Sequence, residues 1–459
     1  MMLSEIAKAL SAPMRGADVS VLSVGTDSRS IAKGQLFVGI KGEHFDGNSY
    51  AQEALKQGAA AVMISDENIA ANPSVLVENT RLALGELAYY WRNKFELPLV
   101  AVTGSNGKTT VKEMITAILN AAHGKVLATR GNLNNDIGMP LTMLGLNEKH
   151  TFAVIEMGMS HEGEIRYLTK IAQPKVALVN NAGTAHIGEV GSREAIARAK
   201  GEIFEGLAGD GIAIINADDD FADYWKSLNK NRKIITFGLN ASADVTATYR
   251  KQNNASQIQL KTPSGSAELS LNVLGEHNVH NALAASAVAV ALGVSNADIA
   301  KGLSQFNPVK GRLSWLQGIN GAAVIDDTYN ANPDSMRAAI DVLASQKETQ
   351  TFVMGDMAEL GADAPQMHAE IGAYAKQKGI DYFFSFGEFS KLASASFGQN
   401  AQHFDALEAL LDALRGGMKT NVTVLVKGSR FMKMERVVNE IVKEKINQII
   451  KGKNVEGAH

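Results

Sequence analysis

The sequence predicts an α/β protein with three domains, the central one built on a parallel sheet. A chain of 459 residues is long enough for about three domains at roughly 150 residues each. Short runs in its middle part are apolar on both faces, as buried parallel strands are. Glycines fall mostly where these runs give way to helical periodicity, which is typical of strand–turn–helix units. The expected buried strands are 97–104, 151–158, 175–181, 211–218 and 233–238.

Two changes of pattern divide the chain. An amphipathic helix is expected over 81–95, between an N-terminal block with its own strand and helix patterns and the first buried strand of the middle part. A Pro/Gly turn at 307–312 follows an Ala-rich helix, and strand and helix patterns alternate again after it. Residues 241–275 alternate with a period of two, which predicts a small antiparallel sheet within the middle domain. The predicted domains are 1–82, 83–311 and 312–459.

The composition excludes several classes of function. Lys and Arg number 45 and Asp and Glu 48, a net charge of −3, so the chain lacks the basic excess that nucleic-acid binding needs. The absence of Cys removes disulfides, thiolate metal sites and cysteine nucleophiles, and it fits a reducing compartment. No run reaches the ~18 apolar residues of a membrane span, and the first residues lack the basic and apolar regions of a signal peptide. We therefore expect a cytoplasmic protein that has no membrane span and does not bind nucleic acid.

The strongest local motif is AVTGSNGKTTVKEMITAIL at 101–119, a hydrophobic strand, a glycine-bearing turn and an amphipathic helix. Its glycines allow backbone N–H groups to point at phosphate oxygens, and the helix presents its positive dipole end. Lys108 is expected against the β- and γ-phosphates of a nucleotide, with the Thr109 hydroxyl on Mg²⁺. The predicted nucleotide-binding residues of the motif are Gly104, Ser105, Asn106, Gly107, Lys108, Thr109 and Thr110.

The loop departs from the usual phosphate-binding pattern at one position. Val102 stands where that pattern has its first glycine, five residues before Gly107, so the motif here is shortened to TGxxGKTT. The alternative interpretation is a plain strand-to-helix turn with a surface lysine. The flanking strand and helix favour phosphate binding.

Two further residues are expected at the same edge of the sheet. Glu156 lies at the end of the buried run 151–158, and His186 follows the run 175–181. Ligands collect at the carboxyl ends of parallel strands, so Glu156 is a candidate oxygen ligand for Mg²⁺ and His186 a candidate neighbour of the metal. Taken singly, each could instead be structural, Glu156 as a satisfied strand-end carboxylate and His186 as a core histidine.

With three further stretches, GEHNVHNALAA at 275–285, KGR at 310–312 and DDTYNANPDS at 326–335, the chain resembles the Mur ligase family from end to end. Members of this family are ATP-dependent, amide-forming enzymes of peptidoglycan synthesis. The resemblance implies a central P-loop ATPase domain, a C-terminal Rossmann-like domain that closes over ATP, and a smaller N-terminal α/β domain that binds a UDP-sugar. The further ATP contacts that it implies are Asn278 and Asn281 on the adenine side, Arg312 and Asp327 over the phosphates and ribose, and Tyr329.

The stretch 26–50 resembles the UDP-sugar-binding domain of the members that add the third and later residues of the stem peptide. Ser28 and Arg29 suit a diphosphate because a hydroxyl and a guanidinium hold phosphate oxygens with directed hydrogen bonds; the alternative is a turn with a surface arginine. The stretches 131–142 and 326–336 resemble the member that adds D-alanyl-D-alanine to a UDP-muramoyl tripeptide. The substrate-binding residues implied are Ser28, Arg29, Asp46, Asn134, Asn135, Ser160, Arg166, Asn330, Asn332, Ser429 and Arg430.

The resemblance also implies a modified lysine. Lys200 matches a position that is carbamylated in most members, where the carbamate supplies an anionic oxygen to a second Mg²⁺. The alternative is an exposed helix lysine paired with Glu194 or Glu202. In the same way, Arg312 could form a linker salt bridge and Asp327 could cap a strand end. The implied metal-site residues are Thr109, Glu156, His186 and Lys200, and the implied catalytic residues are Lys108, His186 and Lys200.

The implied mechanism starts from a carboxylate, which is too poor an electrophile to accept an amine directly. Its attack on the γ-phosphate of ATP gives an acyl phosphate and ADP, and the amine of D-alanyl-D-alanine then displaces phosphate. Ser429 and Arg430 are expected to meet the carboxylate of the dipeptide, although Arg430 could also be only a surface charge. The implied partners are these two small-molecule substrates, and we expect a monomer.

Two rival interpretations stay open at this point. A folylpolyglutamate synthetase-type ligase shares the ATPase domain and the chemistry, but such enzymes begin almost at the phosphate loop, whereas a whole block with TDSR and DGNSY precedes it here. A nucleotide-dependent regulatory ATPase that binds a partner belongs to a different class. The sequence also leaves open whether the third peptide residue is diaminopimelate or lysine.

Overall fold

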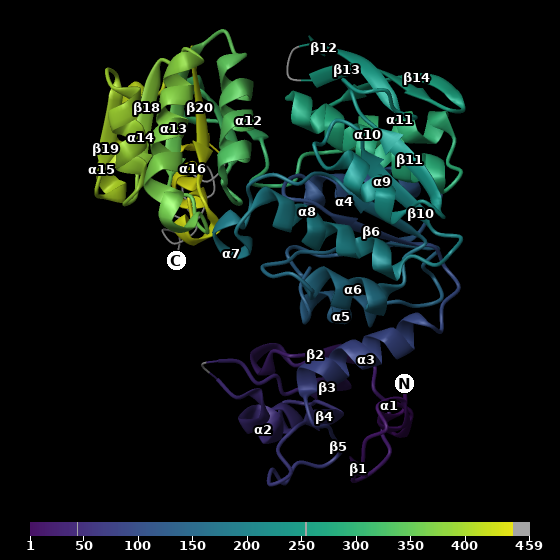
Figure 1. Ribbon diagram of the computed structural model, residues 1–459. Coiled ribbons are helices and arrows are strands. Elements are labelled where there is room, and N and C mark those ends of the chain that lie inside the picture. Colours follow the sequence, from purple (N-terminus) through teal and green to yellow (C-terminus); the bar gives the residue numbers. More distant parts are fainter. Residues whose placement is uncertain (44, 253–254, 444–459) are drawn as a thin grey trace, which may run out of the picture.

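The computed structural model describes residues 1–43, 45–252 and 255–443 (Figure 1). The N-terminal part has a five-stranded sheet in the order β1-β5-β4-β3-β2, parallel except for β1. Apolar side chains on one face of this sheet, among them Leu36 and Val38, pack against Leu3 and Ile6 of the first helix. The elements are α1 (Leu3–Ala9), β1 (Met14–Arg15), β2 (Ser23–Gly25), β3 (Gln35–Val38), α2 (Ala51–Lys56), β4 (Ala61–Ile64), β5 (Ser74–Leu76) and α3 (Thr80–Arg92).

The middle part has a six-stranded, fully parallel sheet in the order β11-β10-β9-β6-β8-β7. Its strands are β6 (Leu99–Thr103), β7 (Val126–Ala128), β8 (Phe152–Glu156), β9 (Val176–Val179), β10 (Ile212–Asn216) and β11 (Lys233–Phe237). All five strands expected from the sequence are confirmed, and β7 is an additional edge strand.

Helices cover both faces of this sheet, as the double-sided apolar runs predict. Val100 and Val102 pack with α4, α10 and α11 on one face, whereas Leu99 and Ala101 pack with α5, α6, α8 and α9 on the other. The helices are α4 (Lys108–Ala121), α5 (Gly138–Met143), α6 (Glu164–Ala172), α7 (Ile187–Val190), α8 (Arg193–Gly201), α9 (Ala222–Leu228), α10 (Glu276–Ala291) and α11 (Asn296–Gln305).

The small antiparallel sheet expected within 241–275 is also confirmed. Its strands β12 (Thr246–Gln252), β13 (Ala255–Thr262) and β14 (Gly265–Leu271) pair in sequence order. Ile258, Leu260, Leu269 and Leu271 join the core that contains α4 and α10. The sheet therefore extends the middle domain beyond the carboxyl end of β11, where Phe237 pairs with Val245.

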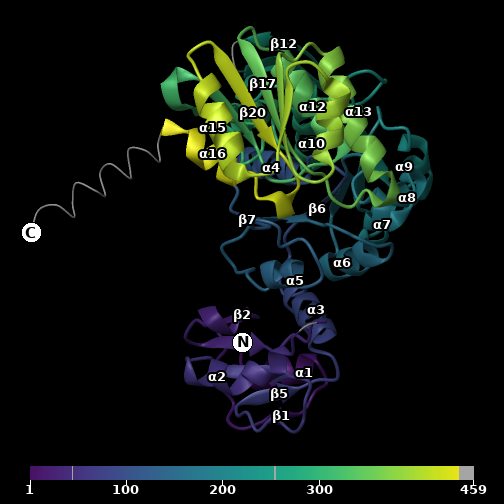
Figure 2. The same ribbon diagram turned by 90° about the vertical axis from the view of Figure 1, so that its left-hand side faces the viewer.

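The C-terminal part has a second six-stranded sheet, in the order β15-β16-β20-β17-β18-β19, parallel except for β15. Helices lie on both of its faces, as in a Rossmann-like domain (Figure 2). The elements are β15 (Ser314–Gln317), β16 (Ala323–Asp327), α12 (Pro333–Ala344), β17 (Thr349–Gly355), α13 (Ala364–Gln377), β18 (Tyr382–Phe386), α14 (Ser390–Phe397), β19 (Ala401–Phe404), α15 (Leu407–Gly417), β20 (Val422–Lys427) and α16 (Glu435–Ile441).

Helix α3 joins the N-terminal lobe to the rest of the molecule, and Figures 1 and 2 show it between the two. Its Leu84 and Leu87 belong to the N-terminal core, while Ala88 belongs to the core of the middle domain. The predicted boundary near residue 82 thus falls inside a helix that both cores share, and the three domain limits stay a prediction. None of the helices in the described part of the chain is long and apolar enough to cross a membrane.

Candidate active site

A cavity of about 1290 Å³ lies between the middle and third domains. Its walls are the loops that follow β6, β8 and β9, the start of α10, and the loops that follow β16, β17 and β20. The predicted residues that line it are Ser105, Asn106, Gly107, Lys108, Thr109, Thr110, Asn134, Asn135, Glu156, Ser160, His186, Asn278, Asn281, Arg312, Asp327, Tyr329, Asn330, Asn332, Ser429 and Arg430.

The phosphate loop is held by residues that follow β9. Asn181 accepts the N–H of Ser105 with its backbone oxygen at 3.0 Å and the N–H of Asn106 with its side chain at 2.8 Å. Gly107 has a left-handed φ of +80°, and a Cβ there would lie 2.3 Å from Asn281 Oδ1, so the position needs glycine. Helix α4 begins directly after Gly107, and no side chain of the described residues caps it. Its first N–H groups can therefore bind an anion.

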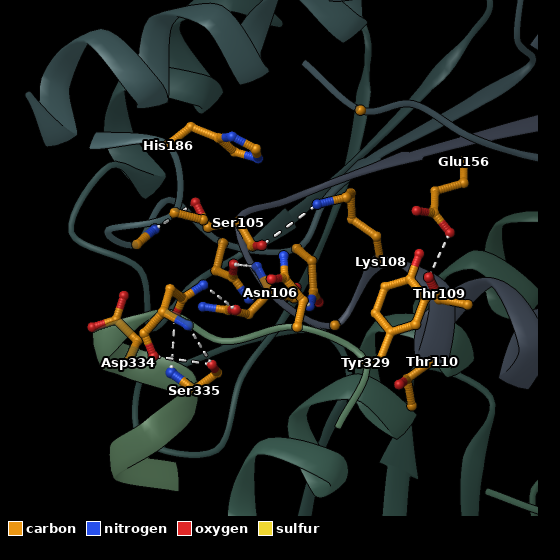
Figure 3. Close-up of a pocket in the computed structure, with 18 of the residues that line it drawn as sticks. Ser105, Asn106, Lys108, Thr109, Thr110, Glu156, His186, Tyr329, Asp334 and Ser335 are labelled. Atoms are coloured by element: carbon orange, nitrogen blue, oxygen red, sulfur yellow. Dashed lines mark hydrogen bonds between the residues drawn. The ribbon is translucent and has the colours of Figure 1, made fainter. Parts of the chain in front are cut away.

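Lys108 is the first residue of α4 and folds back over the loop. Its Nζ donates to the Gly104 carbonyl at 2.7 Å. It also donates to the Ser105 carbonyl at 3.4 Å (Figure 3). Burial lowers the pKa of the Lys108 amine, while the charges of Glu156 and Glu359 oppose this shift. The amine thus lies at the phosphate loop within electrostatic reach of two carboxylates.

Thr109 and Glu156 meet as the strand order predicts. The Thr109 hydroxyl donates to Glu156 Oε2 at 2.8 Å (Figure 3), and Asn134 donates to Glu156 Oε1 at 2.8 Å. Arg312 of the third domain donates to the Thr109 hydroxyl at 2.9 Å. A hydroxyl beside a buried carboxylate fits Mg²⁺, which in nucleotide sites takes one or two protein oxygens together with phosphates and water. The described residues contain no cluster of three or more His, Asp or Glu that could hold a metal alone.

Lys200 lies on α8 and is only 1% exposed. Burial, together with the charge of Lys108, lowers its pKa well below the ordinary range of a lysine. The alternative of an exposed lysine paired with an acid therefore does not fit: Glu202 accepts the backbone N–H of Arg166 at 3.0 Å and pairs with its guanidinium at 3.2 Å. Arg166 lies outside the cavity lining, as does Lys200. The lowered pKa favours the unprotonated amine, which is the form of lysine that reacts with carbon dioxide to give a carbamate.

His186 caps the short helix α7 and points its ring at the third domain. Its Nδ1 lies 2.6 Å from Oε2 of Glu359, a residue that the sequence analysis missed. Pairing with His186 lowers the pKa of the Glu359 carboxyl, against the opposing effect of burial. Figure 3 places His186 and Glu156 on either side of Lys108. His186 thus lies near the phosphate loop of the middle domain, while its ring is paired with a residue of the third domain.

The third domain brings a cation and an aromatic ring over the loop. The Arg312 guanidinium stacks 4.2 Å from the centre of the Tyr329 ring. Asp327 accepts the backbone N–H of Leu313 at 3.1 Å and pairs with Lys427 Nζ at 2.6 Å. Lys427, also missed from the sequence, ends the buried strand β20 and lines the cavity.

Asn278 and Asn281 lie in the first turns of α10. Asn281 accepts a hydrogen bond from the Asn180 side chain at 3.0 Å and donates one to Asn278 at 3.3 Å, and Asn278 donates to the Leu274 carbonyl at 2.8 Å. The end of β9 is thereby tied to α10 behind the phosphate loop. Asn180, like Asn181, was missed; the paired asparagines directly after a buried strand are the signal that could have indicated both.

The residues expected to bind the dipeptide and the peptide differ in how many hydrogen bonds they already make within the protein. Asn332 donates to Asn106 Oδ1 at 2.8 Å and caps α12, and Asn330 accepts the backbone N–H of Arg430 at 3.3 Å. The Ser429 hydroxyl is buried, accepts the N–H of Ala358 at 2.8 Å and donates to a carbonyl at 3.0 Å, so both of its hydrogen bonds are made within the third domain.

Asn135, Ser160 and Arg430 lie at the more open side of the cavity. Asn135 accepts the backbone N–H of Gly138 at 2.9 Å at the start of α5. The backbone N–H of Ser160 donates to a glutamate side chain at 2.7 Å, which leaves the Ser160 hydroxyl in an exposed position. The guanidinium of Arg430 is exposed and pairs with Glu435 at 2.9 Å.

The three residues expected to bind the UDP group do not line this cavity. Arg29 is almost fully exposed and pairs with Asp27 at 2.9 Å, and the hydrogen bond from Arg29 lowers the pKa of Asp27 to about 2. Ser28 lies in the same single helical turn. Asp46 accepts the backbone N–H of Asn48 at 2.9 Å and so caps the next such turn. The structure therefore places the predicted UDP contacts on a separate lobe.

Asp334 is a further cavity residue that the sequence analysis missed. It lies in the first turn of α12, and its Oδ2 accepts the backbone N–H of Thr184 at 2.7 Å and the Thr184 hydroxyl at 2.9 Å. Sequence alone favours an ordinary helix-start acid at this position. Its role depends on a contact between the two domains.

Three family models match the chain. The model of the "Mur ligase family, catalytic domain" matches residues 20–92. The model of the "Mur ligase middle domain" matches residues 102–289, and that of the "Mur ligase, glutamate ligase domain" matches residues 311–430. The chain belongs to the Mur ligase family.

Individual relatives extend this assignment. The UDP-N-acetylmuramoyl-tripeptide–D-alanyl-D-alanine ligase of Escherichia coli (strain K12) is 42% identical over 443 residues, 96% of this chain and 98% of that protein. The crystal structure of MurF from Acinetobacter baumannii superposes with a TM-score of 0.90 at 39% identity, covering 95% of this chain and 97% of that one. MurF ligase from Thermotoga maritima in complex with ADP gives 0.82 at 28% identity, covering 93% and 98%.

Proposed function

We propose that this chain is the ATP-dependent ligase that joins D-alanyl-D-alanine to UDP-N-acetylmuramoyl-tripeptide through an acyl phosphate. The observation that carries the proposal is the Thr109–Glu156 pair behind the phosphate loop, with Arg312 of the third domain on the same hydroxyl. Such a site can receive the terminal phosphates of a nucleotide and stabilise the charge that develops during transfer. The substrates are supported by the Escherichia coli relative, a UDP-N-acetylmuramoyl-tripeptide–D-alanyl-D-alanine ligase that matches nearly the full length of the chain.

In the first step, the terminal carboxylate of the tripeptide attacks the γ-phosphorus of ATP in line, and ADP leaves. Lys108 and the N–H groups at the start of α4 hold the phosphate oxygens, and Arg312 adds a second cation from the other domain. Mg²⁺ would be held by Thr109, Glu156 and a carbamate on Lys200, with His186 beside a second ion. When bound, it neutralises negative charge on the phosphates.

In the second step, the amine of D-alanyl-D-alanine attacks the acyl carbon, and phosphate leaves. The acyl phosphate is sensitive to water, so the domains must close around it. The hydrogen bonds from Thr184 to Asp334 and from Asn332 to Asn106 join the middle and third domains at this point. They support a docked arrangement in which the γ-phosphate side of the cavity is shielded.

The other predicted residues bind the outer parts of the substrates. Ser28, Arg29 and Asp46 bind the UDP group on the N-terminal lobe, and Asn134, Asn135 and Ser160 of the cavity face the tripeptide. Arg166, which lies outside the cavity lining, would have to leave its pair with Glu202 to reach the tripeptide. Asn330, Asn332 and Arg430 receive the dipeptide, with Ser429 supporting their loop through Ala358. Asn278, Asn281, Asp327 and Tyr329 hold adenine and ribose. We place the enzyme in the cytoplasm as a monomer, in the peptidoglycan precursor synthesis on which cell shape and division depend.

Mass spectrometry of the reaction products tests the proposal. The purified chain is incubated with ATP, Mg²⁺, a UDP-muramoyl tripeptide and D-alanyl-D-alanine, and each component is omitted in turn. A ligase gives the UDP-muramoyl pentapeptide and releases phosphate only when all are present. Phosphate release that ignores both substrates would support a regulatory ATPase instead. In a parallel incubation with ATP, Mg²⁺, a folate and glutamate, a glutamylated folate would support the folylpolyglutamate synthetase alternative.

A further inference from the structure

We propose that Glu359 is a positioning residue for the ligation: it reaches from the third domain to fix the imidazole of His186 beside the phosphate loop. In this arrangement His186 is aligned only while the third domain is docked. The inference rests on the proposed function for its reaction. It gives the loop after β17 a role that neither the sequence motifs nor the position of the loop in the fold indicates.

Glu359 holds the His186 segment at two points. Its carboxylate Oε2 lies 2.6 Å from His186 Nδ1, and its backbone carbonyl accepts the N–H of Gly188 at 3.0 Å. The side chain and backbone of one residue thus contact both ends of a three-residue segment. A carboxylate against one ring nitrogen fixes the orientation of an imidazole and decides which nitrogen remains for the site.

The two segments approach so closely that their backbones are in contact. A Cβ on Gly188 would lie 2.5 Å from the Gly361 nitrogen and 2.7 Å from the Glu359 carbonyl oxygen. His186 and Glu359 also share a rare feature, since both are non-glycine residues with φ values of +64° and +61°. Such conformations persist only where the surroundings fix them, and they gather at functional sites.

The Glu359 loop is rigid because the third domain anchors each residue before it. The Asp356 carbonyl accepts the backbone N–H of Ser429 at 2.9 Å, the N–H of Met357 donates to His368 Nε2 at 2.9 Å, and the N–H of Ala358 donates to the Ser429 hydroxyl at 2.8 Å. Met357 is itself buried, as are Ser429 and His368. These hydrogen bonds fix the backbone that leads into Glu359. The position of the His186 ring therefore depends on the position of the whole third domain.

Glu359 also lines the same cavity as Lys108 and His186. A residue of the third domain thus lies beside both the histidine and the phosphate loop of the middle domain.

The first test compares Glu359→Ala and Glu359→Gln with Asp363→Asn, a matched control on the same loop whose side chain is exposed. Each full-length variant is assayed for pentapeptide formation with UDP-muramoyl tripeptide, D-alanyl-D-alanine, ATP and Mg²⁺. We expect kcat to fall about 10- to 100-fold for Glu359→Ala, the usual cost of losing a group that orients a site residue, with the KM of the UDP substrate unchanged. Glu359→Gln, which keeps an oxygen for the ring, should recover part of the loss, and Asp363→Asn should match the wild type.

A double-mutant cycle separates positioning from a merely structural role. If Glu359 acts through His186, then the variant that combines His186→Ala with Glu359→Ala is as slow as His186→Ala alone. If the double variant lost kcat by the product of the two single losses, the two residues would act independently and the inference would be wrong. A His186→Ala enzyme with wild-type kcat would also overturn it. Gly188→Ala, which changes neither side chain, should also lower kcat by separating the two segments. Thermal unfolding of each variant identifies any loss that comes from misfolding.

The outcome for the wild type keeps the two proposals apart. A wild-type chain that forms no pentapeptide contradicts the proposed function. A wild type that turns over normally, beside a Glu359→Ala variant of equal kcat, contradicts only the role of Glu359.

Discussion

The two ends of the proposed substrate path are built differently. At the phosphate loop, side chains far apart in the sequence bond to one another across the domain boundary: Asn332 with Asn106, Arg312 with Thr109, and Asp334 with Thr184. On the N-terminal lobe, the predicted UDP contacts bond only to near neighbours, Arg29 to Asp27 and Asp46 to Asn48.

This difference indicates what each contact contributes to folding and what it leaves available for ligand binding. The phosphate end is partly buried and preorganised, so removing one partner there leaves an unsatisfied polar group, at about 1–3 kcal/mol each. An exposed ion pair such as Arg29 with Asp27 adds little to folding, and its guanidinium remains available to an anionic ligand. Changes at the phosphate end should therefore damage catalysis, whereas changes at the other end should weaken binding alone.

The largest effect is expected for Lys108→Ala. Loss of this amine removes the cation that the proposed mechanism places at the transferring phosphoryl group, and phosphate release should fall by about 10²- to 10³-fold, the usual cost of one charge-stabilising donor. Calorimetric binding of the UDP substrate to the variant should match the wild type. Lys170→Ala, a change of an exposed lysine on α6, is the control and should keep full activity. A Lys108→Ala enzyme with normal turnover would remove the phosphate loop from the mechanism.

A smaller effect is expected for Asp334→Ala, which tests the contact between the domains. The change leaves the backbone N–H and hydroxyl of Thr184 without their shared acceptor, so kcat/KM should fall by about 10-fold, the equivalent of roughly 1–2 kcal/mol. Asp341→Ala, on the same helix but at the exposed pair with Lys378, should stay near the wild-type rate. Equal rates for the two variants would show that the phosphate end does not depend on this contact.

Arg29→Ala should affect substrate binding without affecting folding. We expect the KM of the UDP substrate to rise about 10-fold, the worth of one charge-assisted hydrogen bond, at unchanged kcat. The free energy of unfolding should change by less than about 0.5 kcal/mol, because the pair with Asp27 is on the surface. Lys33→Ala, another exposed cation of the same lobe, is the control. A lower kcat with constant KM would argue against a role in binding UDP.

The smallest effect concerns acid stability at His368. Its ring is fully buried, accepts the Met357 N–H through Nε2 and contacts the Ala364 carbonyl through Nδ1, and burial lowers its pKa. Below the ordinary histidine pKa of about 6.5, the unfolded chain binds a proton that the folded one does not, so stability falls as the pH falls. Urea unfolding between pH 7.5 and about 5.5 should show a shallower loss for His368→Gln than for the wild type. The exposed His123→Asn should leave the slope unchanged; identical slopes for all three proteins would contradict the assignment.

The sequence is informative where structure follows from neighbours along the chain. The five buried strands and the glycine-lysine turn have local signals, since apolar runs and glycine punctuation act within a few residues. The meeting of Thr109 and Glu156 could also be predicted, because both follow from strand ends of one parallel sheet. The half-buried edge strand β7 is too short to leave such a signal.

What could not be predicted depends on contacts between domains. Asp334 and Glu359 each have an ordinary local explanation, a helix-start acid and a turn residue, and only the folded arrangement brings them to Thr184 and His186. Ser429 illustrates the reverse case. Its hydroxyl follows a strand where a substrate contact is plausible by motif, yet both of its hydrogen bonds are used inside the third domain.

The most direct test of the ligase mechanism follows the oxygen atoms of the acceptor carboxylate. UDP-muramoyl tripeptide labelled with ¹⁸O at its terminal carboxylate is converted with ATP and D-alanyl-D-alanine, and the inorganic phosphate is analysed by mass spectrometry. Transfer of the phosphoryl group to the carboxylate predicts one ¹⁸O atom in the phosphate for each pentapeptide formed. Phosphate without label, alongside a normal yield of pentapeptide, would contradict the acyl phosphate and with it the role given to Lys108, Thr109 and Glu156.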